Sequence, residues 1–394
     1  MERIGVYGGT YNPPHIGHIR AAQYALETLC LDRLLLIPTC ISPHKQLPIG
    51  SASPKQRMQM LQIAAGEEKK IQVCDIELRR GGASYTYETL EQLRELYPQD
   101  QLILLMGTDM FVTFDSWRKP ERILELAELG VFYRGDREEA QKLAEKKTLL
   151  EPTGAKITLI ENPVTQISST QLRRMTVFEC AGEFLPKGVL EYIRQEKLYG
   201  TGRNYKKLPI EELERVVTEL LDPKRVPHVL GCRDTAARMA KIWGVDETIA
   251  ARAGLLHDIT KALDGPLQLT LCREYGKVLD DFSCKNPKTL HALTGSLVAE
   301  RIFGECPEVV TAIASHTTGK ANMTTLQKII YVADYMEPNR DFPGVETLRH
   351  LAFTDLDGAL KLGLQMTLEV LKAQGRDISP ESREALAYLN ENSR

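Results

Sequence analysis

A chain of 394 residues exceeds one typical domain, and its length predicts two. Its hydrophobic content of 43%, charged content of 26% and net charge of −3 describe a globular chain, and the absence of a basic tail or Lys/Arg block argues against nucleic-acid binding. Eight cysteines without a CxxC pair, no signal peptide and no apolar run of membrane length predict a cytoplasmic protein with reduced thiols and no membrane attachment.

The first predicted unit is a strand, a glycine-rich turn and a helix around residues 8–18, GGTYNPPHIGH. Gly8 and Gly9 allow a tight turn and the close approach of a ligand. Free N–H groups at the start of the helix favour phosphate. His15 and His18 stand three residues apart at that start, so both imidazoles can face one anion. A phosphate cradle with two histidines and no P-loop lysine points to nucleotidyl transfer.

Short apolar runs and helical patterns then alternate along the first half of the chain. We expect strands at 34–37, 71–74, 102–106, 131–133 and 157–160, and helices near 54–65, 86–96, 120–128, 137–147 and 186–196. This alternation predicts an α/β, Rossmann-like, doubly wound parallel sheet with helices on both faces. Ligands of such sheets bind beyond the carboxyl ends of the strands.

Candidate ligand residues follow these strands or begin the next helix. They are Lys45, Tyr85, Thr86, Gly107, Asp109, Trp117 and Arg134. Each has a structural alternative: Lys45 can be a solvated loop lysine, Thr86 a helix N-cap and Trp117 a core residue. Trp117 in a polar loop could equally stack on a pyridine ring.

A second helix start follows at residues 167–170, Ile-Ser-Ser-Thr, with Arg173 one turn later. Hydroxyl groups at a helix N-terminus cap the helix. The same hydroxyls, the free N–H groups and Arg173 can also hold a triphosphate.

The turn at 8–18 resembles the HxGH signature of the nucleotidylyltransferase superfamily, and ISSTxxR at 167–173 resembles its second hallmark. The wider string is most similar to nicotinate-nucleotide adenylyltransferases, which join ATP to nicotinate mononucleotide on the route to NAD. The resemblance implies Mg²⁺ bridging the phosphate oxygens and catalytic roles for His15, His18 and Arg173. It implies ATP contacts at Gly8, Gly9, Thr10, His15, His18, Gly107, Asp109, Ile167, Ser168, Ser169, Thr170 and Arg173. It implies nicotinate mononucleotide contacts at Asn12, Lys45, Tyr85, Thr86, Trp117 and Arg134.

The chain departs from this family pattern at three positions. Many relatives have Phe-Asp where this chain has Tyr11-Asn12, so metal or phosphate affinity could differ. The usual aspartate of the segment at 84–90 is Glu88 here.

The alternative function for the first domain is a related transferase that acts on another phosphate acceptor, such as pantetheine phosphate.

Beyond residue 199 the pattern changes from alternating strands and helices to helices alone. A polar, glycine-containing stretch at 200–207 is a reasonable linker. The sequence thus predicts a transferase domain at 1–199, a linker at 200–207 and an all-α domain at 208–394.

Histidines and aspartates in the second half form a candidate metal site. An adjacent His-Asp pair ends an apolar helix at 250–256, and imidazole with carboxylate suits Fe, Mn or Zn. Six such residues could serve two metals in phosphoester hydrolysis, although any one of them alone is more often structural. The candidates are His228, His257, Asp258, His291, His316 and Asp334.

The order H…HD…H…H…D resembles the two-metal branch of the HD phosphohydrolase superfamily, whose fold is a helical bundle. The strings AGLLHDITK (253–261), SHTTG (315–319), YVADYMEPNR (331–340) and the tail DISP (377–380) resemble its YqeK-type family, symmetrical diadenosine tetraphosphate hydrolases of bacteria. The resemblance implies cleavage into two ADP with two metal ions, and relatives favour iron. It implies one metal on His228, His257, Asp258 and Asp334, a second on His291 and His316, and phosphate contacts at Lys261 and Arg340, with a catalytic role for Lys261.

The sequence therefore predicts a bifunctional enzyme that binds ATP, nicotinate mononucleotide and diadenosine tetraphosphate. A homodimer is left open. Two alternatives remain for the second domain. It can hydrolyse another nucleotide phosphoester, or it can be a metal-poor, regulatory nucleotide-binding module.

Overall fold

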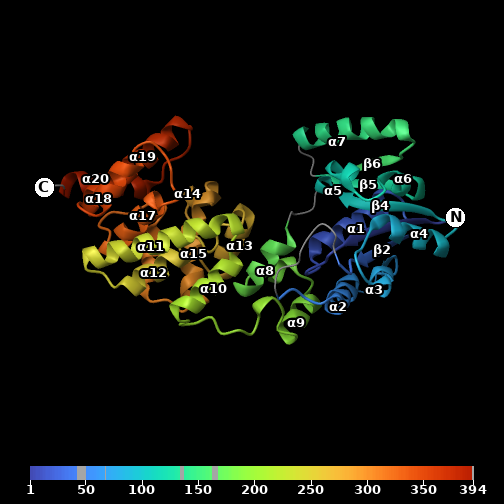
Figure 1. Cartoon of the computed structure of the whole chain (residues 1–394), viewed down its shortest axis with the longest axis horizontal. Coiled ribbons are helices and arrows are strands. Elements are labelled where there is room, and N and C mark those ends of the chain that lie inside the picture. Colours follow the sequence, from blue (N-terminus) through green and yellow to red (C-terminus); the bar gives the residue numbers. More distant parts are fainter. Residues whose placement is uncertain (42–49, 67, 134–136, 162–166, 393–394) are drawn as a thin grey trace. The chain divides into compact units, whose positions relative to one another are not determined.

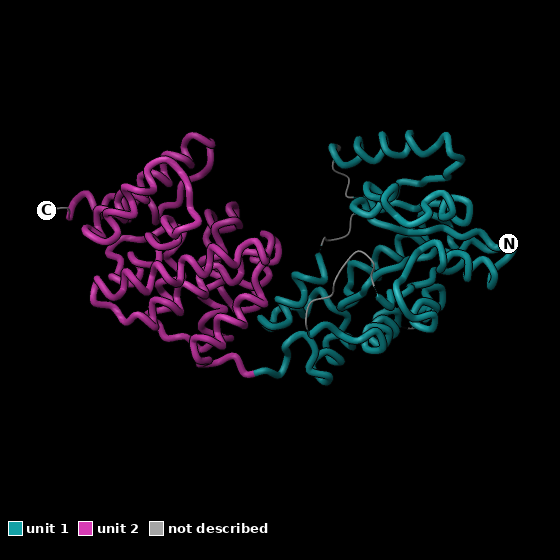
Figure 2. The backbone as a smooth tube through the Cα atoms, viewed as in Figure 1, with its two compact units in different colours: residues 1–203 teal, residues 204–394 magenta. Residues whose placement is uncertain are grey.

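The computed structural model describes residues 1–41, 50–66, 68–133, 137–161 and 167–392 (Figure 1). The chain divides into two compact units, residues 1–203 and 204–394 (Figure 2). Of the helices within the described ranges, none combines the length and apolar character that a membrane crossing needs.

The first unit is built on a parallel sheet of six strands in the order β3-β2-β1-β4-β5-β6. The strands are β1 (Arg3–Gly9), β2 (Arg33–Pro38), β3 (Ile71–Val73), β4 (Gln101–Gly107), β5 (Glu128–Tyr133) and β6 (Ile157–Glu161). The strand order reverses between β1 and β4, and ligands of doubly wound sheets bind at this switch point, beyond the carboxyl ends. The predicted fold class is confirmed.

Helices cover both faces of this sheet (Figure 1). They are α1 (Ile16–Thr28), α2 (Pro54–Ala65), α3 (Ile76–Arg80), α4 (Thr86–Leu96), α5 (Thr108–Val112), α6 (Pro120–Leu126), α7 (Arg137–Leu150), α8 (Ser169–Val177) and α9 (Lys187–Gln195). Side chains of β2 alternate between two apolar clusters: Leu34 and Leu36 pack with residues of α1, whereas Leu35 and Ile37 pack with residues of α4 and α6. Because both faces are buried, the strand is continuously apolar.

The second unit is helical throughout its described residues, as predicted. Its helices are α10 (Ile210–Leu220), α11 (Val226–Trp243), α12 (Glu247–Leu256), α13 (Gly265–Glu274), α14 (Asp281–Lys285), α15 (Leu290–Arg301), α16 (Pro307–Ser315), α17 (Thr325–Met336), α18 (Val345–Ala352), α19 (Leu356–Ala373) and α20 (Pro380–Asn392). Asp246 caps α12 through the N–H of Ile249, at 2.9 Å. Gly254 lets α12 lie close to α11, because a Cβ there would come within 2.8 Å of the Cα of Arg233.

Candidate active sites

The two hallmark segments of the first unit meet at the turn between β1 and α1. The Ser169 hydroxyl donates to the carbonyl oxygen of Pro13 (3.0 Å), and Nη1 of Arg173 donates to that of Asn12 (2.7 Å). Ser168 caps α8 by accepting from the N–H of Gln171 (3.2 Å). The N-terminus of α8 therefore lies against the turn that carries both histidines, although these segments stand about 150 residues apart in the sequence.

Asn12 is buried and uses both ends of its amide. Its Oδ1 accepts from the Tyr199 hydroxyl (2.7 Å), and its Nδ2 donates to the Ser51 hydroxyl (2.9 Å). Burial raises the pKa of Tyr199, which keeps this hydroxyl a donor. An ionised carboxylate only accepts, so it would lose the donation to Ser51. The asparagine thus holds the turn by neutral hydrogen bonds.

His15 and His18 are stacked, with ring centroids 3.6 Å apart. The backbone N–H of His15 donates to Nδ1 of His18 (3.2 Å), so a neutral His18 carries its proton on Nε2. Burial lowers the pKa of His18 to about 4. Burial and the neighbouring His18 lower the pKa of His15 well below its usual value. Both rings are therefore neutral at pH 7, and His18 can donate a hydrogen bond through Nε2 without carrying charge.

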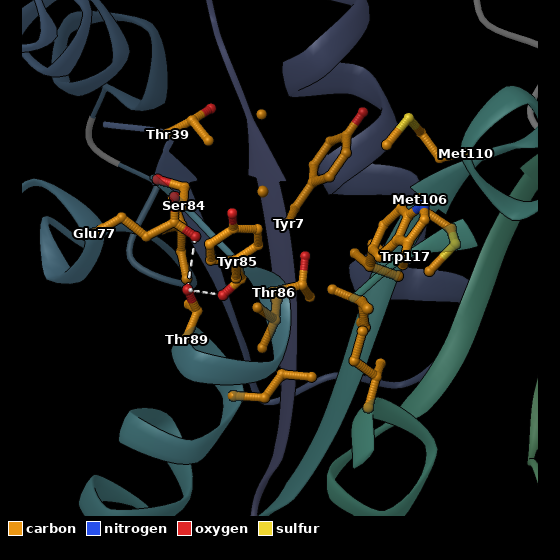
Figure 3. Close-up of a pocket in the computed structure, with 18 of the residues that line it drawn as sticks. Tyr7, Thr39, Glu77, Ser84, Tyr85, Thr86, Thr89, Met106, Met110 and Trp117 are labelled. Atoms are coloured by element: carbon orange, nitrogen blue, oxygen red, sulfur yellow. Dashed lines mark hydrogen bonds between the residues drawn. The ribbon is translucent and has the colours of Figure 1, made fainter. Parts of the chain in front are cut away.

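A cavity of about 320 Å³ opens beyond the carboxyl ends of β1, β2 and β4. Glu77, Ser84 and Thr89 form one side of it, and Met106 and Trp117 form the other (Figure 3). Eight predicted ligand residues line this cavity: Gly8, Gly9, Thr10, His18, Tyr85, Thr86, Gly107 and Trp117. The remaining described predictions, His15, Asn12, Asp109, Ile167, Ser168, Ser169, Thr170 and Arg173, are not among its lining residues. Lys45 and Arg134 lie outside the described residues.

Trp117 combines the two roles that its sequence context left open. Its ring packs against Phe114 of the core, with centroids 5.5 Å apart, and it also lines the cavity. The predicted N-cap at Thr86 is wrong: Tyr85 occupies the cap position and Thr86 is the first residue of α4. The guanidinium of Arg118 lies over the Tyr85 ring, 4.5 Å from its centroid.

Arg57 on α2 is a residue of this site that the sequence analysis missed. Its side chain is buried and donates to the carbonyl oxygens of Thr10 (2.7 Å) and Thr39 (2.6 Å). It thereby ties the glycine-rich turn to the loop after β2. The available signal was an arginine three residues before Met60, on the buried face of α2.

Glu77, also missed, lines the cavity from α3. Its Oε1 accepts from the Thr89 hydroxyl (2.7 Å), and burial raises the pKa of its carboxyl group.

In the second unit the candidate metal ligands gather around Asp258. Its Oδ2 lies 3.5 Å from Nε2 of His257 and 3.7 Å from Nε2 of His228. Its Oδ1 lies 3.5 Å from Nε2 of His291 and 3.8 Å from Nε2 of His316. This carboxylate is buried, and Oδ1 has no hydrogen-bond partner among the described residues. Asp258 therefore presents one oxygen to each of two histidine pairs.

Asp334 completes the group on the Oδ2 side. Its Oδ1 lies 3.1 Å from Nε2 of His228 and 3.7 Å from Nε2 of His257. The structure thus brings the six predicted ligands into one cluster. The sequence resemblance implied that Asp258 serves only the first metal, whereas its Oδ1 faces the second histidine pair as well.

All four histidines of the cluster are oriented by their outer nitrogen. In each of them Nδ1 is bound to a carboxylate or a carbonyl oxygen, which leaves Nε2 facing the cluster. The partners are Glu337 for His228 (3.1 Å), Gly254 for His257 (2.8 Å), Lys288 for His291 (2.9 Å) and Ile313 for His316 (2.7 Å). The Nε2 atoms of the four histidines, together with Oδ1 of Asp258, form a set of donor atoms that fits divalent metal ions.

Three cationic side chains border this cluster. Lys261 lies 2.8 Å from Nε2 of His291, Arg340 donates to Asp334 (2.8 Å), and Arg225 donates through Nε to Asp258 (2.6 Å). Lys261 and Arg340 were predicted. Arg225 was missed, although it lies three residues before His228, and so was Glu337, three residues after Asp334. Such a border of cations suits a substrate with several phosphates.

Comparisons with known proteins match both halves of the chain. A cytidylyltransferase-like family model matches residues 6–175, and an HD-domain model matches residues 225–339. A probable nicotinate-nucleotide adenylyltransferase of Borreliella burgdorferi is 36% identical over 198 residues, which are 50% of this chain and 96% of that protein. One of Oceanobacillus iheyensis is 34% identical over 205 residues, 52% of this chain and 100% of that protein.

A crystal structure of a predicted HD superfamily hydrolase involved in NAD metabolism, from Clostridium acetobutylicum, is 37% identical to this chain. The match covers 47% of this chain and 98% of that one, with a TM-score of 0.46. The identity to adenylyltransferases matched over nearly their whole length shows that the chain belongs to the nicotinate-nucleotide adenylyltransferase family, and the family model shows an HD domain at residues 225–339.

Proposed function

We propose that the first unit transfers AMP from ATP to nicotinate mononucleotide, yielding nicotinate adenine dinucleotide and pyrophosphate. The observation that carries this proposal is the contact of α8 with the β1–α1 turn, where Ser169 and Arg173 bind the carbonyl oxygens of Pro13 and Asn12. This contact joins a second helix N-terminus to the phosphate cradle of the histidines. The relatives that share a third of their residues with this chain carry the same activity in their names.

In the proposed reaction the phosphate of nicotinate mononucleotide attacks the α-phosphorus of ATP. The bond from that phosphorus to the bridging oxygen breaks, and pyrophosphate leaves. His18 donates through Nε2 to an α-phosphate oxygen while negative charge builds there. The N-terminal hydroxyls of α8 and Arg173 hold the β- and γ-phosphates, and Mg²⁺, when bound, neutralises their oxygens. Tyr85, Thr86 and Trp117 receive the nicotinate ring, with Lys45 and Arg134 as further acceptor contacts.

The test is an acceptor comparison with the full chain, ATP and Mg²⁺. Nicotinate mononucleotide, nicotinamide mononucleotide and pantetheine phosphate are supplied separately, and the product of each is resolved by chromatography. The highest kcat/KM with nicotinate mononucleotide supports the proposal. A preference for pantetheine phosphate would contradict it and assign the alternative acceptor.

We predict that Arg57→Lys lowers kcat/KM of the transferase by about 10- to 100-fold, because the amine cannot span the carbonyl oxygens of both Thr10 and Thr39. The matched control is Arg94→Lys. Arg94 also donates to two carbonyl oxygens, those of Asp100 (2.6 Å) and Leu126 (2.7 Å), but at the opposite end of the sheet. Steady-state kinetics and thermal unfolding are measured for both variants. Equal losses of activity would mean that Arg57 only stabilises the fold.

For the second unit we propose metal-dependent, symmetrical hydrolysis of diadenosine tetraphosphate. Water adds to one of the two central phosphorus atoms, the bond to the central bridging oxygen breaks, and two ADP leave. The observation that carries this proposal is Asp258, whose Oδ2 faces His228 and His257 and whose Oδ1 faces His291 and His316. Two metal ions, for which we propose iron, supply activated water and neutralise phosphate charge when bound. Lys261, Arg340 and Arg225 hold the phosphates.

The test uses the full chain, purified without oxygen, with its metals counted before diadenosine tetraphosphate is added. Two ADP and two metal ions per chain are the expected result. AMP with ATP would mean that an outer phosphoanhydride bridge breaks instead of the central one, and would contradict the symmetrical mechanism. Bound metal without turnover would favour another nucleotide phosphoester, and no metal would favour the regulatory module.

A further inference from the structure

The segment that leads into α20 contacts the chain just before α15, the helix that carries His291, and the loop that begins at His316, the C-cap of α16. The carboxylate of Asp377 accepts from Nδ2 of Asn286 (3.4 Å), five residues before His291. The hydroxyl of Ser382 donates to the carbonyl oxygen of Thr318 (2.7 Å), two residues after His316. A segment more than 60 residues beyond His316 therefore joins the start of α15, where His291 lies, to the loop that follows His316.

The serines of this segment are buried and paired. Ser379 and Ser382 are each 4% exposed, and their hydroxyl oxygens lie 2.9 Å apart. The N–H of Ser382 donates to the Ser379 hydroxyl (3.1 Å), which fixes the first turn of α20. Since a buried hydroxyl that loses its partner is costly, the donation from Ser382 to Thr318 defines where this loop lies.

The loop after His316 also packs closely on α20. Gly319 has a φ of +67°, and a Cβ at this position would lie 3.5 Å from the Cβ of Ala385 and 3.4 Å from Leu364. Between this glycine and His316 stands Thr317, whose hydroxyl lies 3.1 Å from Nε2 of His291 and 3.2 Å from Nε2 of His316. A shift of the loop would therefore move both a ligand and the hydroxyl beside it.

We propose that the segment Asp377–Ser382 positions His291 and His316, and with them the metal subsite on the Oδ1 side of Asp258. Ser382 is the main positioning residue, and Asp377 supports it from the other loop. The inference rests on the proposed two-metal hydrolase. It predicts an asymmetric effect, because the ligands of the other subsite come from α11, α17 and the end of α12.

The test titrates Mn²⁺ into the metal-free full chain without nucleotide, by calorimetry and electron paramagnetic resonance. Wild type is expected to bind two ions that give a spin-coupled signal. Ser382→Ala is expected to weaken one of the two sites by about tenfold, as loss of an outer-shell contact does, and to leave the other within about twofold. Asp377→Ala should shift the same site by less. Circular dichroism and thermal unfolding of the same samples report that the helical second unit of each variant is folded.

The matched control is Tyr388→Phe. This tyrosine lies on the same helix and also donates to the loop, to Oδ1 of Asn322 (3.1 Å), but six residues beyond His316. Equal weakening of both sites by Ser382→Ala, or the same shift from Tyr388→Phe, would assign α20 a general stabilising role and overturn the inference. Unchanged binding would also overturn it. A wild type that binds fewer than two ions would refute the two-metal proposal itself, and this failure is visible before any variant is made.

Discussion

Asp258→Asn is expected to abolish binding of two divalent ions and hydrolysis of diadenosine tetraphosphate, while the transferase keeps its activity. The carboxylate faces both histidine pairs, through Oδ2 on one side and Oδ1 on the other. The neighbouring imidazoles, led by His257, lower the pKa of Asp258 well below its usual value although burial opposes this, so it is an anion. An amide is uncharged, and its NH₂ end would point a donor where a ligand is needed.

Glu337→Gln is a comparison variant for which we expect a smaller loss of metal binding than for Asp258→Asn. Glu337 contacts Nδ1 of His228, at 3.1 Å, rather than a face of the cluster that a metal would occupy, so exchanging its carboxylate for an amide should weaken metal binding by about 10- to 100-fold rather than abolish it. Metal content by mass spectrometry, after reconstitution without oxygen, separates the two cases. An Asp258→Asn chain that retains two metals and symmetrical hydrolysis would refute the assignment of Asp258 as the shared ligand.

A helix or strand could be predicted where the spacing of apolar residues extends over enough residues to show the period of that element. Residues 34–37 of the strand Arg33–Pro38 are apolar without interruption because both faces of the strand are buried there, and a strand was expected at these residues. Helices α3 and α5 were missed, since each has five residues and shows less than two turns of apolar spacing. Their place is set by the strands and loops around them rather than by their own sequence.

The residues of the candidate sites also fall into a predictable and an unpredictable group. Ligands such as His257 and Asp258 were predicted from their residue types and their order in the chain, and the structure brings them together. Arg57 could not be predicted as a site residue, because its burial depends on carbonyl oxygens of Thr10 and Thr39, which the sheet brings to it from other segments. Ser382 was hidden for the same reason, since its partner Thr318 lies 64 residues earlier.

His18→Ala is the second variant with a large expected effect: we predict that kcat of the transferase falls by about 10²- to 10³-fold, as removal of one preorganised donor does. His18 lines the cavity, and its Nδ1 accepts from the N–H of His15 (3.2 Å), which leaves Nε2 as the protonated nitrogen. The KM for ATP should change less, because the turn is held by Arg57, Arg173 and Tyr199. His18→Gln, which keeps a neutral donor, should recover part of kcat. A His18→Ala enzyme with unimpaired kcat would refute this role.

The charge of His18 gives this prediction a second, independent readout. Burial lowers its pKa from 6.5 to about 4, so the folded chain holds fewer protons on this ring than the unfolded chain as the pH falls below 6.5. The contribution of His18 to stability is therefore present above pH 6.5 and is lost as the pH falls towards 4. Nitrogen NMR of the histidine-labelled chain, with His18→Ala identifying the resonance, should show a neutral ring protonated on Nε2 from pH 8 to 5.5. Titration of His18 near pH 6.5 would mean that water reaches the ring, and that a cation rather than a neutral donor meets the α-phosphate.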